Sequence, residues 1–271
     1  MYLFLIVLLG VCAVSCQGQS VNTRLGARAA AMGYATFAVA DETSVFNNVG
    51  SLARVPQSGL IFCYESAAEL PGANRTGAGI TIRKAASAIA LGFFRFGDPV
   101  YHEQLVSAAY GNRIGNTSLG VKVNYVQYRA DGFGTRSTVT ADVGGLTQIT
   151  PQLAVGAGVY NITQSAIAEN EELPVILVAA IGFQPTPLLL LVAEAEKRLG
   201  SPLTVKGGAE VAIYKKIFVR TGFNLNPTSL HTGIGAKTHR ISIDYAIRFS
   251  HLLGFAQHAS ASVRLHSGKG K

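Results

Sequence analysis

Charged and amide side chains recur at every second position of several short segments, with apolar residues between them. Asp244 and Arg248, for example, alternate with Ile243, Tyr245 and Ile247. Side chains two apart in a β-strand lie on one face of the sheet, where acids and bases on neighbouring strands can pair. The residues that we assign to this polar face are Lys122, Asn124, Asp142, Glu194, Lys206, Glu210, Arg220, Asp244, Arg248 and Arg264.

Patterns typical of catalysis or metal binding do not occur in the sequence. The 6 histidines have no metal-ligand spacing and no cysteine partners them. There is no nucleophile-elbow motif, and Gly156-Ala157-Gly158 lies in a strand pattern with no helix after it to hold a phosphate. We therefore expect that the chain is not an enzyme and holds no cofactor.

Strands must position the polar face, and the alternation predicts about fourteen of them, each about ten residues long. We place them at 59–65, 77–83, 88–96, 104–111, 117–128, 137–148, 152–163, 175–183, 188–197, 203–214, 217–225, 230–237, 241–250 and 255–266. Two folds suit such strands. In a soluble sandwich the apolar side points inward, whereas in a transmembrane barrel it faces lipid and the charges face a lumen.

Composition favours the transmembrane barrel. Charged residues are 14% of the chain, well below the roughly 25% of soluble domains, and the mean hydropathy is +0.29. The formal charge of +8 is spread singly along the strands and has no aromatic-and-basic pattern beside it. We therefore expect membrane lipid as a partner and no nucleic acid.

The first residues favour export. Residues 1–16 form an apolar run with small residues at its end, which predicts a signal peptide. Residues 13–16 loosely resemble a lipoprotein cleavage box, so lipidation of Cys16 and ordinary removal of the peptide are both open. The location that these features predict is the cell outer membrane.

The connections between the predicted strands fall into two groups. Those after even-numbered strands are tight, whereas those after odd-numbered strands include the two longest, at 66–76 and 164–174. Short periplasmic turns opposite longer outer loops are typical of an outer-membrane barrel. We therefore expect one barrel at 57–266 with both ends on the periplasmic side, followed by a basic tail at 267–271.

Residues 17–56 do not alternate and are rich in alanine. Arg24 and Arg28 accompany Asp41 and Glu42 in this segment, and such a mixture suits a polar lumen better than a free tail. We therefore expect an N-terminal plug inside the barrel.

The plug segment resembles the PorV/PorQ family of outer-membrane proteins, which are relatives of FadL-type barrels and are found mainly in Bacteroidetes. The similar stretches are 26–33, 40–42 and 47–53, followed by 142–151, Asn161, 220–223, 244–246 and 253–254. The residues that match the plug motif are Arg28, Met32, Gly33, Asp41, Glu42, Asn47 and Asn48.

This resemblance implies a fourteen-stranded barrel with a plug that serves type IX protein secretion by engaging secretion-system proteins or secreted cargo. FadL relatives instead carry hydrophobic small molecules, and this alternative stays open. Apolar residues that we place on the inner face, namely Phe94, Tyr110 and Phe218, favour the alternative because a hydrophobic ligand would need them.

Overall fold

A computed structural model of the protein describes residues 23–70, 72–168 and 171–265. The predicted signal peptide, Cys16 and the basic tail lie outside these ranges. Within them, no helix is long and apolar enough to cross a membrane.

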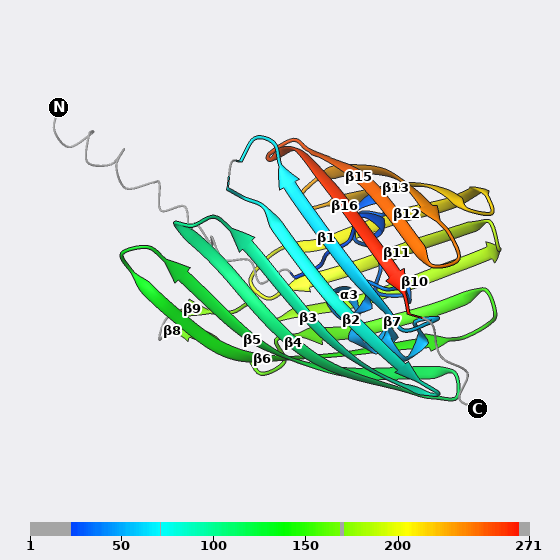
Figure 1. The fold of residues 1–271 in the computed structure, drawn as a ribbon, viewed down its shortest axis with the longest axis horizontal. Coiled ribbons are helices and arrows are strands. Elements are labelled where there is room, and N and C mark those ends of the chain that lie inside the picture. Colours follow the sequence, from blue (N-terminus) through cyan, green and yellow to red (C-terminus); the bar gives the residue numbers. More distant parts are fainter. Residues whose placement is uncertain (1–22, 71, 169–170, 266–271) are drawn as a thin grey trace.

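Fourteen antiparallel strands close into a barrel, in which β1 pairs with β2 on one side and with β16 on the other (Figure 1). The barrel strands are β1 (Gly59–Ala67), β2 (Arg75–Lys84), β3 (Ser87–Gly97), β4 (Tyr101–Ile114), β5 (Thr117–Ala130), β6 (Gly134–Gln148), β7 (Leu153–Tyr160), β10 (Ile176–Thr186), β11 (Leu189–Arg198), β12 (Leu203–Tyr214), β13 (Ile217–Leu225), β14 (Ser229–Lys237), β15 (Ile241–Ser250) and β16 (Gly254–Arg264). This architecture confirms the predicted closed barrel of about fourteen strands.

Each strand has an exposed outer face and a largely buried inner face. In β15, Ile243 is 60% exposed and Tyr245 is 40% exposed, whereas Ala246 is fully buried. Exposed apolar side chains recur on the outer faces of the other strands, such as Phe62 on β1 and Leu119 on β5. An apolar exterior around a charged interior is the arrangement of barrels that span an outer membrane. The molecule is an outer-membrane type of β-barrel.

The two ends of the barrel differ in their connections. At one end, which we call the short-turn end, residues 85–86, 115–116, 187–188 and 215–216 join strands directly. The opposite end, the long-loop end, carries the connections 68–74 and 161–175. The second of these contains two short strands, β8 (Ala166–Ala168) and β9 (Glu171–Glu172).

The wall is uneven between β6 and β10. β6 has 15 residues and β7 has 8, so β7 pairs with β6 only from Val143 to Gln148. Beyond that point the connection 161–175 lies against β6, where the Ile162 amide donates to the Ala141 carbonyl at 2.8 Å. β8 and β9 lie beside the long-loop ends of β5 and β6 (Figure 1).

Residues 23–56, which we call the plug, lie inside the barrel (Figure 1). The plug contains two short helices, α2 (Ala27–Ala31) and α3 (Ser44–Asn47), and a 3-10 helix, η1 (Val49–Arg54). α2 contacts β13 to β16, whereas η1 contacts β3 to β6. The plug therefore bridges opposite sides of the wall.

Glycines in the wall let the plug approach closely. Gly208 and Gly222 are cross-strand partners on β12 and β13. A Cβ at Gly208 would lie 2.6 Å from the Met32 carbonyl oxygen, and a Cβ at Gly222 would lie 2.8 Å from the Met32 Cα. Any larger residue would push the plug away from these strands, so the glycines make room for it.

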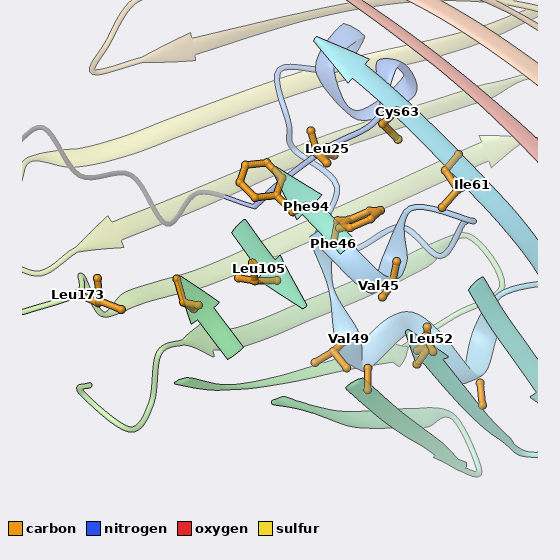
Figure 2. Close-up of a cluster of buried hydrophobic side chains, with 14 of the residues drawn as sticks. Leu25, Val45, Phe46, Val49, Leu52, Ile61, Cys63, Phe94, Leu105 and Leu173 are labelled. Atoms are coloured by element: carbon orange, nitrogen blue, oxygen red, sulfur yellow. The ribbon is translucent and has the colours of Figure 1, made fainter. Parts of the chain in front are cut away.

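Apolar residues of the plug pack against one side of the lumen. Figure 2 shows Phe46 close to Phe94 and Val45, with Leu105 and Leu173 further along the same cluster. The complete set of buried residues in this cluster, which we call the apolar cluster, is Leu25, Val45, Phe46, Val49, Leu52, Ile61, Cys63, Ala88, Ala90, Phe94, Leu105, Ala109, Val126, Tyr128, Ile167 and Leu173. All of the wall strands that contribute to it lie between β1 and β5.

Candidate functional site

The inner faces of β11 to β16 carry a network of ion pairs with the plug. Arg24 pairs with Glu194, and its second terminal nitrogen lies 3.1 Å from Glu196 Oε2. Lys206 Nζ lies 2.6 Å from the same Glu196 oxygen. The Phe37 backbone amide donates to Glu194 Oε2 at 3.0 Å. These carboxylates therefore bind both the plug and the wall.

A second group fixes α2 to the wall. Arg28 Nη2 lies 2.7 Å from Glu210 Oε1, and Arg28 Nη1 lies 2.9 Å from Asp41 Oδ2. On the wall, Arg220 contacts Glu210 and also lies 2.6 Å from Asp244 Oδ1. Each charged residue in this series of ion pairs has a neighbour of opposite charge, which offsets the free-energy cost of removing it from water.

A third group lies at the seam where β1 meets β16. The Tyr34 hydroxyl donates to Glu65 Oε2 at 3.2 Å, and Arg75 Nη1 lies 2.9 Å from the same oxygen. His258 Nδ1 is 3.4 Å from this carboxylate, and Arg248 Nη1 is 3.8 Å from it. Burial and the neighbouring Glu65 carboxylate raise the pKa of Tyr34 well above its usual value, so the phenol keeps its proton.

The remaining predicted residues lie at two other places. Arg264 Nε lies 3.1 Å from Glu42 Oε1 near the short-turn end. Lys122 Nζ lies 3.1 Å from Asp142 Oδ2, and Asn124 donates to the same carboxylate oxygen at 3.0 Å. The structure thus brings the ten predicted polar residues together with the plug in separate groups and does not gather them into one centre.

The other plug-motif residues shape the plug itself. Asn47 accepts from the Leu25 amide at 3.1 Å and donates to the Leu25 carbonyl at 3.0 Å. Asn48 accepts from the Gly50 amide at 2.8 Å and donates to the Phe37 carbonyl. Gly33 has φ 64°, a conformation that glycine adopts without strain. These contacts assign the motif to the architecture of the plug.

Several residues of the network were not among the predicted site residues. Tyr34, Glu65 and Arg75 join plug to wall but were not selected from the sequence, whereas the alternation does assign their neighbour His258 to the polar face. Glu65 and Arg75 lie near the ends of their strands, where the alternation is weak. The one signal that pointed to Glu65 is its place at the end of a clear apolar alternation in β1.

The predicted inner-face aromatic residues need a correction. Phe94 is 2% exposed and belongs to the apolar cluster, but Tyr110 is 48% exposed and lies on the outer face of β4. Phe218 does lie on the inner face, where Arg220 Cζ lies over its ring, 5.6 Å from the ring centroid. The prediction was wrong for Tyr110 because Ala108, Ala109 and Gly111 give no contrast between the two faces at this point.

A cleft opens at the long-loop end beside the apolar cluster. It has a volume of about 180 Å³, and we call it the aromatic cleft. Its lining residues are Tyr101, Tyr128, Ala130, Phe133, Gly134, Arg136, Ile167 and Glu171. Tyr128 and Ile167 belong both to this cleft and to the apolar cluster, so the two are continuous.

A second hollow, which we call the vestibule, also opens at the long-loop end, on the side of the barrel opposite the aromatic cleft, and Tyr34 is among its lining residues. Its volume is about 410 Å³. The residues lining it are Tyr34, Arg75, Glu196, Arg198, Ser201, Pro202, Thr204, Lys206, Asn224, Asn226, Pro227, Ser229, Arg248, Ser250 and Leu253. Unlike the aromatic cleft, it is mostly polar and carries several cations.

Among the described residues, no group of three or more His, Cys, Asp or Glu side chains is positioned to hold a metal ion. The carboxylates described above pair with arginine, lysine or histidine side chains instead.

Comparison with known proteins places the fold. No protein-family model matches the chain, and no curated protein sequence matches it. Solved structures do resemble it. The CymD monoaromatic hydrocarbon channel has a TM-score of 0.71 at 14% identity, over 92% of this chain and 99% of that one.

A FadL homologue from Pseudomonas aeruginosa has a TM-score of 0.67 at 12% identity, over 89% of this chain and 98% of its own. A deltaS2 mutant of the TodX monoaromatic hydrocarbon channel has a TM-score of 0.63 at 11% identity, over 91% of this chain and 100% of its own. The chain has the fold of FadL-like outer-membrane barrels. At these identities, the likeness establishes the fold and leaves the function to be argued from the lumen.

Proposed function

We propose that this chain is a plugged channel of the cell outer membrane that admits small apolar molecules. The observation that carries the proposal is the continuity between the aromatic cleft and the apolar cluster, through Tyr128 and Ile167. This continuity favours transport of hydrophobic solutes over the secretion role that the plug motif suggested.

The apolar cluster offers a path along one side of the lumen. Beyond Ile167, the cluster includes Leu173 and Leu105, then Phe94, and it reaches Phe46 of the plug (Figure 2). A solute moving along these side chains would not have to desolvate a charge. The plug closes this path, so passage requires the plug to shift away from the wall.

The size of the aromatic cleft suits one aromatic ring. Its volume is about 180 Å³, and an apolar cavity of about 150 Å³ holds one benzene molecule in another protein. Two of the structural neighbours are described as monoaromatic hydrocarbon channels, which supports the same class of solute here. We therefore propose monoaromatic hydrocarbons as solutes, and no enzymatic activity.

The proposal is tested by placing a charge where the aromatic cleft meets the apolar cluster. Ile167 is 7% exposed and lines the cleft, so Ile167→Asp should lower the initial rate of toluene uptake about tenfold in cells whose outer membrane lacks other channels for apolar solutes. Ile162→Asp is the matched control, because Ile162 lies in the same connection but is 48% exposed. The amount of folded barrel in each variant is measured by its heat-modifiable migration in gel electrophoresis. Equal uptake rates in the two variants, at equal amounts of folded barrel, would overturn the proposal.

The plug motif favours a second candidate function, namely engagement of type IX secretion components or cargo. Arg28, Asn47 and Asn48 of that motif form plug contacts, so the motif fits a plugged barrel of either function. Affinity purification from native outer membranes should recover secretion-system proteins if this second function holds. Repeated recovery of the barrel alone would exclude it.

A further inference from the structure

We propose that the vestibule binds small hydroxylated organic anions of the sugar-acid class, at a site separate from the aromatic cleft. The vestibule is lined by Arg75, Arg198, Lys206 and Arg248, with Glu196 as the carboxylate among its lining residues. Counted with their buried neighbours Arg24, Glu65 and Glu194, these groups are five cations and three carboxylates, which leaves a surplus of positive charge at the mouth of the lumen. A negatively charged solute is therefore concentrated there.

The cations of the vestibule are not all committed to internal pairs. Lys206 pairs with Glu196, and Arg75 pairs with Glu65. Arg248, in contrast, approaches Glu65 only to 3.8 Å, and its buried Nε has no hydrogen-bond partner among the described residues. A guanidinium in this condition can donate to a carboxylate in the forked geometry that arginine favours.

A second buried group in the vestibule also lacks a partner. Ser250 is 3% exposed, lines the vestibule, and its Oγ has no hydrogen-bond partner within the described part of the chain. A buried hydroxyl without a partner costs free energy, and a ligand that bonds to it recovers that cost. Ser250 and Arg248 are two apart on β15 and share its inner face, so one ligand can reach both.

The remaining lining indicates the body of the ligand. Asn224, Asn226, Ser229 and Thr204 line the hollow with amides and hydroxyls. The Thr204 hydroxyl donates to the Asn226 carbonyl and keeps its lone pairs to accept from a ligand hydroxyl. A volume of about 410 Å³ exceeds what a small inorganic ion fills and lies within the usual range of about 300–1,000 Å³ for organic ligands. A carboxylate on a hydroxylated carbon chain satisfies both the cations and the polar walls.

Isothermal titration calorimetry on the purified full chain in detergent tests this site by measuring the affinities for gluconate and for sorbitol, its uncharged counterpart. Gluconate should bind at least about tenfold more tightly than sorbitol. Arg248→Met and Arg198→Met should each weaken gluconate binding about tenfold, since a hydrogen bond to a charged group is lost. Arg198→Met is included because it leaves the contacts of Glu65 with Arg75 and Arg248 intact.

Arg240→Met is the control, because Arg240 is exposed at the short-turn end and its loss changes the net charge equally. Equal affinity for gluconate and sorbitol, or an equal loss of affinity in Arg240→Met, would overturn the proposal. Toluene uptake should be unchanged in Arg198→Met. The proposal of an anion site and the proposal of an apolar channel can thus be refuted independently of each other.

Discussion

The two sides of the lumen hold the plug by different means. From β1 to β5, the wall packs apolar side chains against α3 and η1. Two charged exceptions are the Glu65 and Arg75 pair at β1 and β2 and the Lys122 and Asp142 pair at β5 and β6. From β11 to β16, the wall meets the plug through ion pairs such as those of Arg24 and Arg28. Apolar packing is non-directional, whereas ion pairs require a fixed geometry. The comparison indicates that the ionic side positions the plug and that the apolar side offers a path beside it.

The largest expected effect comes from breaking the ionic side. Glu194 has a side chain that is 0% exposed and lies between Arg24 and Lys206. Glu194→Leu leaves both cations to share Glu196, and removing one partner of a buried pair costs about 3–5 kcal/mol. We expect a loss of this size in the free energy of unfolding, measured by urea titration in detergent.

The same variant should also loosen the plug. We expect single-channel conductance in planar bilayers to rise above that of the unaltered protein, since Arg24 and the Phe37 amide lose their anchor. Glu172→Leu, a change at an exposed position of β9, is the control and should alter neither measurement. A stable, non-conducting Glu194→Leu protein would mean that the ionic side does not position the plug.

A somewhat smaller effect is expected on the apolar side. Leu105 is 3% exposed on the inner face of β4, and its truncation to alanine leaves a cavity that costs about 2–5 kcal/mol. Because no ion pair is lost, the plug should stay seated and conductance should stay low. Val106→Ala changes the neighbouring outward side chain, which is 53% exposed, and should have much less effect on unfolding. Conductance as high as in Glu194→Leu would remove the distinction between the two sides.

The smallest effect concerns the connection 161–175, which forms part of the apolar side. Asn161 has φ 51° and donates to the Leu173 carbonyl at 2.9 Å, while its Oδ1 accepts from the Ser165 amide at 3.0 Å. Asn161→Gly keeps the backbone conformation available but loses these bonds, at about 1 kcal/mol each.

We expect Asn161→Gly to speed amide hydrogen exchange within 161–175 and to leave exchange in β11 to β16 unchanged. Thr150→Gly, in a connection at the other end of the barrel, serves as the control and should not affect residues 161–175. Faster exchange throughout the barrel would show that the connection supports the whole wall instead of one side.

The strand pattern predicted the barrel because alternation is a local property of the sequence. Each of the fourteen predicted segments overlaps a barrel strand, and Ile241–Ser250 coincides with β15. Errors arise where the local contrast is low. β7 ends at Tyr160 instead of 163, and β8 and β9 went unpredicted because strands of 3 and 2 residues are too short to show a period.

The lumen was less predictable than the wall. Alternation assigns Glu210 and Arg220 to a shared face, and the structure pairs them across β12 and β13. It cannot reveal that Arg28 reaches the same carboxylate, because this contact joins residues 182 apart in the sequence. The aromatic cleft and the vestibule depend on many such distant contacts, and so they emerge only from the folded chain.

Cys63 gives the plug a built-in chemical reporter. It is the free cysteine of the described residues, it is 1% exposed, and it belongs to the cluster that Phe46 and Leu25 complete. A thiol reagent added from the aqueous side can reach this sulfur only after the plug has withdrawn. The rate of Cys63 modification therefore counts openings of the barrel without any engineered label.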